Sequence, residues 1–128
     1  MSSENPKRIL ILDDDVKVRT MYGFWLTEEG YHVVHAANGL EAISLHRQNP
    51  FDLIILELVL ADNDAFETFA ELRRMDSPPK FIATSKSNRI PAELHLKMAR
   101  HLGAHRTLAK PFTAEQLVAA VRSVLALE

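Results

Sequence analysis

The chain has 128 residues, carries a formal net charge of −2 and contains no cysteine. This length suits one domain with its own core, and the slight acidic excess offers no basic surface of the kind that neutralises nucleic-acid phosphates. The missing cysteine excludes disulfide bridges and thiolate zinc sites. We therefore expect a flexible tail over residues 1–6, a single domain over residues 7–128, and no binding of nucleic acid by this chain alone.

Apolar stretches in the chain are short. None approaches the roughly 18 residues that a membrane-spanning helix requires, and the polar start MSSENPKR lacks the apolar segment of a signal peptide. We expect no membrane association and a cytoplasmic location.

Short apolar runs alternate with helical patterns along the chain. The runs predict five strands, over residues 9–12, 31–36, 53–56 and 81–84 and around Leu108. Between them, apolar residues recur three or four apart and start or stop signals flank them. These stretches predict five helices, from residue 16 to the cap Gly30, from 40 to 48, from 65 to a stop at 77–79, from 91 to about 101, and from the capping box at Thr113 onward.

Strand and helix alternate five times, which implies right-handed crossovers, a parallel sheet and helices on both faces. The expected fold class is therefore α/β, with (βα)5 topology. Leu53–Leu56 is the most apolar run and suits a central strand buried on both faces. Polar residues follow four of the strands, and because the carboxyl ends of parallel strands meet at one edge, they should converge on one site. They are Asp13, Asp14, Glu57, Thr84 and Lys110.

The motifs RILILDDD, FDLIILE, FIATS and LAKPF, in this order and spacing, resemble those of the receiver domains of two-component response regulators. The resemblance covers nearly the whole chain. It implies a doubly wound, flavodoxin-like sheet of five parallel strands in the order 2-1-3-4-5 and a cis bond between Lys110 and Pro111. It also implies a signalling role in a phosphorelay rather than an enzymatic one.

The resemblance assigns a role to each converging residue. Glu57 stands at the phosphoacceptor position, Asp13 and Asp14 form the acidic pocket, and Thr84 and Lys110 stand at the switch and phosphoryl-binding positions. Mg²⁺ is the one cofactor implied, with Asp13, Asp14 and Glu57 as its candidate ligands. From the residues alone, the aspartates have another interpretation, as caps of the following helix.

The chain departs from the family pattern at the acceptor and at the switch. The family's acceptor is an aspartate, and Glu57 is longer by one carbon, about 1.5 Å. An aromatic residue that swings inward on activation is replaced by Thr107. The stretch after the fourth strand looks longer than usual, so Ser85 and Ser87 are alternative hydroxyls. A lone acceptor change suggests an engineered Asp-to-Glu variant, whereas several departures suggest a naturally divergent pseudo-receiver.

The extra carbon of Glu57 has two expected consequences. The carboxylate occupies space that metal or phosphoryl oxygens would need, and because catalysis tolerates such misplacement poorly, phosphoryl transfer should be slow or absent. The displaced charge can also reach Lys110 or Thr84 and mimic phosphorylation, although one carboxylate carries less charge than a phosphate. A scaffold that does not switch is the alternative, and Thr84 would then be a strand-end hydroxyl bonded to backbone.

Three hypotheses about function stay open. The first is a protein-interaction module that is independent of aspartyl phosphorylation and binds a partner through the face from the fourth strand to the last helix. The second is a working phosphoacceptor receiver, and the third is a flavodoxin-like protein that binds a small ligand, which the acidic first loop disfavours. The expected partner is a histidine kinase, a phosphotransferase, or an output protein or domain; a homodimer is also compatible.

Two further expectations concern the surface. The histidines show no metal-ligand spacing and are predicted to be surface residues; they are His32, His35, His46, His95, His101 and His105. In the helix over 91–101, Leu94, Leu96 and Met98 cannot all face the core. At least one apolar side chain of that helix is therefore available for contact.

Overall fold

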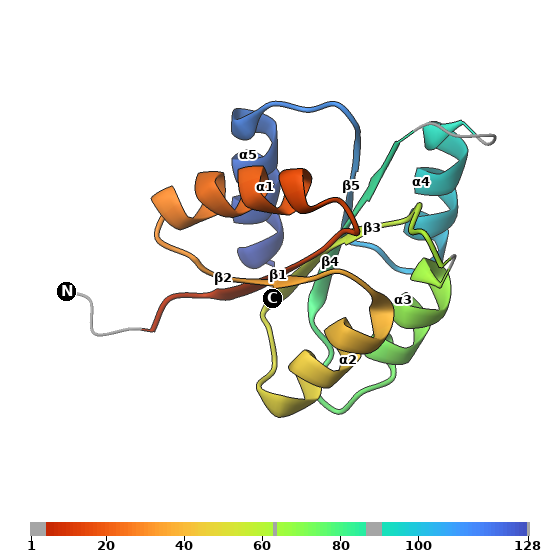
Figure 1. The fold of residues 1–128 in the computed structure, drawn as a ribbon, viewed down its shortest axis with the longest axis horizontal. Coiled ribbons are helices and arrows are strands. Elements are labelled where there is room, and N and C mark those ends of the chain that lie inside the picture. Colours follow the sequence, from red (N-terminus) through yellow and green to blue (C-terminus); the bar gives the residue numbers. More distant parts are fainter. Residues whose placement is uncertain (1–4, 63, 87–90, 128) are drawn as a thin grey trace.

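The computed structural model describes residues 5–62, 64–86 and 91–127. Within these residues, five strands alternate with five helices (Figure 1). The strands are β1 (Arg8–Leu12), β2 (His32–Ala36), β3 (Leu53–Glu57), β4 (Lys80–Ser85) and β5 (Arg106–Ala109). The helices are α1 (Val16–Glu28), α2 (Gly39–Gln48), α3 (Ala65–Arg73), α4 (Ala92–Leu102) and α5 (Ala114–Leu125).

The strands form one parallel sheet in the order β2-β1-β3-β4-β5. The predicted fold class and strand order are thus confirmed. β3 lies at the centre, and all five of its residues are buried, because helices cover both faces of the sheet. The bond between Lys110 and Pro111 is cis, as the resemblance implied.

Alternate residues of the strands pack into two separate hydrophobic cores, one on each face of the sheet. Leu10, Ile54 and Phe81 point to the side covered by α2, α3 and α4. Ile9 and Ile55 point to the opposite side, where α1 and α5 pack (Figure 1). This alternation follows from the two-residue period of a strand, and it explains why the central strands are apolar without a break.

The helix ends follow the local signals of the sequence. Asn38 accepts a hydrogen bond from the Glu41 amide at the start of α2, and Thr113 and Gln116 form the predicted capping box of α5. Gly103 ends α4 with φ of +118°, a conformation that residues with a Cβ rarely adopt. The termini that the sequence predicted lie within a few residues of those observed.

Two histidines contradict the prediction that all six lie on the surface. His46 is 2% exposed, and its Nδ1 accepts a hydrogen bond from the Phe51 amide while its Nε2 lies 2.8 Å from the Ser77 carbonyl oxygen. His95 is also buried, with its Nδ1 3.2 Å from Ser85 Oγ. Burial is tolerated because protein groups bond ring nitrogens that would otherwise lose water. The other four histidines are exposed, as predicted.

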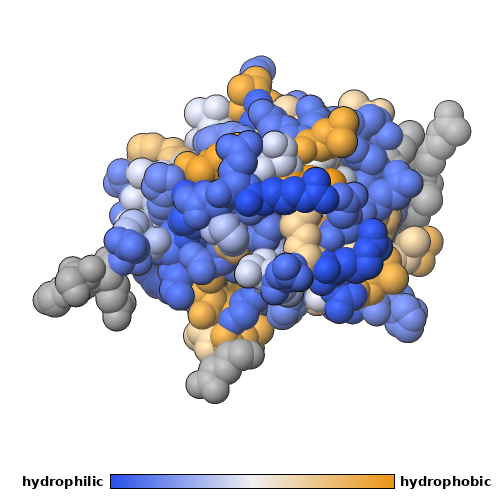
Figure 2. Space-filling model, turned by 90° about the horizontal axis from the view of Figure 1, so that it is seen from below, coloured by the Kyte–Doolittle hydropathy of each residue, from blue (hydrophilic) through white to orange (hydrophobic). Residues whose placement is uncertain are grey.

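The face of the domain shown in Figure 2 is mostly hydrophilic, and hydrophobic residues lie there in separate spots among hydrophilic ones. The outer strands of the sheet, β2 and β5, are short and carry exposed polar residues such as His32 and Arg106. In the part of the chain that the structure describes, no helix combines the length and the apolar character needed to cross a membrane.

Two leucines on neighbouring helices of one layer differ in burial, and substituting each one tests how much burial contributes to the stability of the fold. Leu72 of α3 is completely buried, whereas Leu40 of α2 is 80% exposed. We expect Leu72→Ala to lower the free energy of unfolding by about 2 to 5 kcal/mol, and Leu40→Ala to change it by less than about 0.5 kcal/mol. Denaturant unfolding followed by circular dichroism measures both. Equal effects would contradict the packing described for this layer.

Candidate functional site

The strand register brings the predicted site residues to one edge of the sheet. Asp13 follows β1, and the last residue of that strand pairs with the one before Glu57. Glu57 itself pairs with Thr84 on β4. Lys110 directly follows β5, whose last residue pairs with Ser85. These side chains, which are far apart in the sequence, therefore start from adjacent backbone positions.

The Lys110 ammonium joins two carboxylates from different strands. Its Nζ lies 2.6 Å from Glu57 Oε1 and 2.7 Å from Asp13 Oδ2. All three side chains are largely or fully buried, so their charges are poorly screened by water. Burial alone would lower the pKa of Lys110, but the charges of Glu57 and Asp13 outweigh it and raise that pKa above its ordinary value.

Both oxygens of the Glu57 carboxylate are engaged. Oε1 contacts Lys110 and accepts a hydrogen bond from Thr84 Oγ1 at 3.2 Å, while Oε2 accepts one from the Val59 amide at 2.8 Å. The side chain is 0% exposed. Glu57 therefore points into the pocket rather than into solvent, and both groups that a displaced carboxylate was expected to reach lie beside it.

The three successive aspartates have different partners. Asp13 is buried, and besides its ion pair it accepts a hydrogen bond from the Asp15 amide. Asp14 is exposed and accepts a hydrogen bond from the Ala61 amide at 2.7 Å. Asp15 caps α1 through the Lys17 amide. Asp15 is thus the residue whose side chain caps α1. Asp13 instead forms an ion pair with Lys110, and Asp14 accepts a hydrogen bond from the loop after β3.

Residues of α1 complete the pocket, and the sequence interpretation did not identify them as site residues. Arg19 donates to the Asp13 carbonyl oxygen at 2.6 Å, and the Tyr22 ring lies 5.9 Å from Lys110 Nζ. Burial raises the pKa of Tyr22 above its ordinary value, although the Lys110 ammonium opposes this. Tyr22 belongs to the apolar stripe of α1, so the sequence signal indicated only a core residue.

Two of the remaining predicted residues connect α4 to the sheet. Thr107 accepts a hydrogen bond from Arg100 of α4 at 2.8 Å. Ser85 lies against His95 of α4, so it is Thr84 that contacts Glu57. The other alternative hydroxyl, Ser87, lies outside the described residues.

The pocket does not fit a cation placed between Asp13 and Glu57, because the Lys110 ammonium lies there. Across residues 5–62, 64–86 and 91–127, no three side chains of His, Cys, Asp or Glu are grouped so that they could hold a metal ion. As arranged here, the acids take their counter-charge from lysine. The predicted Mg²⁺ ligands stay a prediction.

The sequence model of the response regulator receiver domain matches residues 9–122. The chain belongs to this family. Receiver domains are in general signalling modules rather than enzymes, and they typically bind Mg²⁺ at the phosphorylation site. The family resemblance drawn from the sequence motifs is thus confirmed, and this chain is a receiver domain of two-component systems.

Known proteins resemble this receiver domain along nearly all of its length. The transcriptional regulatory protein ResD of Bacillus subtilis is 28% identical over 98% of the chain, which spans about half of ResD (50%). A two-component response regulator from Clostridium difficile is 28% identical, with a TM-score of 0.82 over 93% of this chain and 95% of that one. The NtrX receiver domain of Brucella abortus, 21% identical, shares the fold, with a TM-score of 0.86 over 94% and 99% of the two chains.

Removing the shared cation tests the energetics of the pocket. In Lys110→Met, two buried carboxylates face each other without a counter-charge, so we expect the free energy of unfolding to fall by about 3 to 5 kcal/mol at pH 7. Denaturant unfolding curves of the unsubstituted domain and of the variant at pH 7 measure this.

The matched control is the double variant Glu57→Gln, Lys110→Met, which removes one charge of each sign. It should regain part of the stability lost by Lys110→Met, because only the Asp13 carboxylate then lacks its partner. A double variant that is less stable than the single one would show that the ion pairs do not control stability here.

Proposed function

We propose that this receiver domain is a protein-interaction module whose conformation does not depend on aspartyl phosphorylation. The main support is the state of Glu57: its carboxylate is fully buried and both of its oxygens are bonded to groups of the protein. Phosphoryl transfer requires a carboxylate oxygen that an incoming phosphorus atom can approach in line. In this pocket that approach would require Glu57 to leave Lys110 or Val59 first.

The same contacts favour one fixed state of the site. The Glu57 carboxylate contacts both Lys110 and Thr84, so this one side chain on β3 is bonded to β4 and to the residue that follows β5. At position 107, a threonine bound to Arg100 replaces the aromatic side chain of the family pattern. We infer that Glu57 supplies a permanent, single-charge imitation of a modified acid and that the site does not alternate between two arrangements.

The surface proposed for a partner is the one formed by α4, β5 and α5. Leu96 of α4 is buried, whereas Leu94, Met98 and Leu102 are each between 44% and 48% exposed. These three lie four residues apart, so they form one apolar stripe along the helix. Lys97 lies beside them. A partner with apolar and acidic residues would complement this stripe.

The identity of that partner is part of the proposal. A histidine kinase, a phosphotransferase, an output protein or domain, and a second copy of the chain all fit a receiver domain. The activity of any longer protein that contains this domain, and its location in the cytoplasm, likewise stay predictions.

Incubation with acetyl phosphate and Mg²⁺, followed by intact-mass measurement, tests independence from phosphorylation. We expect the mass of the domain to stay unchanged, because the buried Glu57 carboxylate cannot meet the donor in line. Glu57→Asp is the matched variant. If only this variant forms an adduct, the length of the side chain at position 57 is what prevents phosphoryl transfer in the unsubstituted domain.

A phosphoryl adduct on the unmodified domain would contradict the proposal if Glu57→Gln abolished it. In that case the domain is a working phosphoacceptor, and the ion pairs of Lys110 must open during the reaction. An adduct retained in Glu57→Gln would indicate modification elsewhere and would leave the role of Glu57 as proposed.

A further inference from the structure

A cluster of cations lies at the edge of the sheet opposite the Glu57 pocket, where β4 and β5 begin. Arg73 ends α3, Lys80 is the first residue of β4, and Arg106 is the first residue of β5. β4 and β5 are neighbouring parallel strands, so their amino ends lie side by side. Together with His105, which precedes β5, these three residues form what we call the basic edge.

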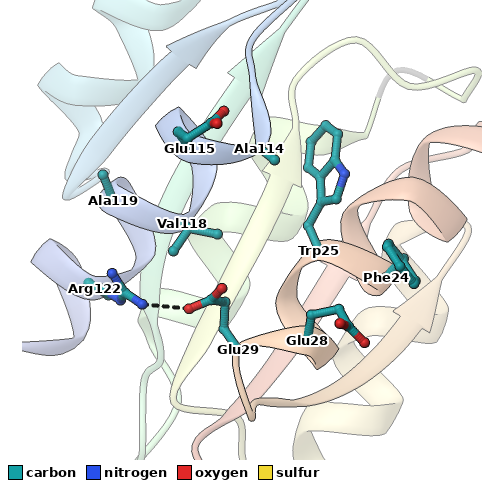
Figure 3. A pocket seen from close by; sticks show the side chains of 9 residues that line it. All are labelled: Phe24, Trp25, Glu28, Glu29, Ala114, Glu115, Val118, Ala119 and Arg122. Carbon is teal, nitrogen blue, oxygen red and sulfur yellow. Dashed lines mark hydrogen bonds and ion pairs between the residues drawn. The ribbon is translucent and has the colours of Figure 1, made fainter.

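Each cation of the basic edge donates a hydrogen bond to an uncharged acceptor. The bonds join Arg73 to the Leu102 carbonyl oxygen, Lys80 to the Leu127 carbonyl oxygen, and Arg106 to Ser123 Oγ. Within the residues that the structure describes, none of the three cations forms an ion pair with a carboxylate. Arg122 of α5 shows the contrast, because its charge is paired with that of Glu29 (Figure 3).

Helix ends account for part of this positive charge. Leu102 is the last residue of α4, and Leu127 follows α5 closely, so two of the bonded carbonyl groups belong to helix carboxyl ends. Each such end carries roughly half a negative charge, and two of them offset about one of the three cations. An excess of about two positive charges therefore remains here, although the whole chain has a net charge of −2.

His105 lies within this excess charge. The residue is exposed, and its Nδ1 accepts a hydrogen bond from the Phe81 amide at 3.0 Å. Partial burial lowers the pKa of His105 below its ordinary value, and the positive charges of Lys80 on β4 and Arg73 on α3 lower it further. An anion bound beside these two cations would oppose their effect, so His105 can report its arrival.

The surroundings of the basic edge narrow the class of anion. Single-stranded nucleic acid usually stacks its bases on exposed aromatic rings, whereas the neighbouring rings of Phe69 and Phe81 are 2% and 1% exposed. Anionic membranes typically attract clusters of about four to eight lysines and arginines, more than this edge contains. We propose that the basic edge binds a carboxylate-rich segment of a partner protein.

The cations can bind such a segment without giving up their present contacts. Arginine and lysine side chains each have several N–H donors, so the bonds to Leu102 and Leu127 leave donors for an incoming carboxylate. Arginine in addition matches the two oxygens of a carboxylate with a pair of parallel bonds. The basic edge borders the surface of α4, β5 and α5 proposed above but contains no residue of its apolar stripe.

The experiment follows His105 by NMR while a peptide of about six aspartates is titrated into the domain at low salt. A peptide of the same length made of serine is the control, and the spectrum of His105→Gln identifies the ring signals. We expect a saturable shift of these signals and a higher pKa of His105 with the aspartate peptide only. Because binding and protonation are linked, the peptide should bind about threefold more tightly at pH 5.5 than at pH 7.5.

Two double variants separate local recognition from the overall charge. Arg73→Gln, Lys80→Gln should weaken the aspartate peptide by about fivefold or more, because it removes both cations that act on His105. Lys17→Gln, Lys86→Gln changes the net charge equally at exposed positions beyond the carboxyl ends of β1 and β4, and should weaken it by less than about twofold. Circular dichroism checks that both variants are folded.

Three results would overturn this proposal. The first is no saturable shift of the His105 signals with the aspartate peptide, which would leave the cations as caps of helix ends only. The second is an equal loss of affinity in the two double variants. The third is binding of inorganic phosphate or of a short thymidine oligonucleotide as tightly as the peptide, which would make the edge a phosphate site. None of these results depends on Glu57 or on the apolar stripe of α4.

Discussion

One ammonium group holds the carboxyl edge of the sheet together. Lys110 follows an edge strand that is short and half-exposed, yet its Nζ reaches Asp13 beyond β1 and Glu57 at the centre of the sheet. Two buried carboxylates that contact the same ammonium group lie close to each other, and they would repel strongly without that cation between them. The two buried acids at this edge therefore depend on one lysine for their counter-charge.

The length of residue 57 determines how the pocket is satisfied. A glutamate extends far enough for one oxygen to meet Lys110 and Thr84 while the other accepts the Val59 amide. The carboxylate thus bonds to β4, to the residue after β5 and to the loop that follows its own strand. A buried polar network is most specific when every member has a partner, and this one leaves neither oxygen of Glu57 unpaired. Both oxygens of the Glu57 carboxylate are thus held by groups of the protein itself.

Different parts of the molecule could be predicted from the sequence to different degrees. The buried run of β3 and the capping box of α5 are local signals, so the elements followed directly, while the strand order needed the family resemblance. The convergence of Asp13, Glu57 and Lys110 followed from strand ends. The burial of His46 did not, because its partners at Ser77 and Phe51 meet it only after α2 and α3 pack. Tyr22 was missed for a related reason, since its spacing indicates only a core face.

The outer strands decide how other molecules can approach this domain. β2 and β5 are short, and their exposed side chains include two histidines and an arginine. Short edge strands with polar side chains disfavour the pairing of a strand from another protein with the edge of the sheet. A protein that binds this domain would then contact side chains of the helical layers rather than the main chain of the sheet, and a substitution of such a side chain would leave the backbone beneath it in place.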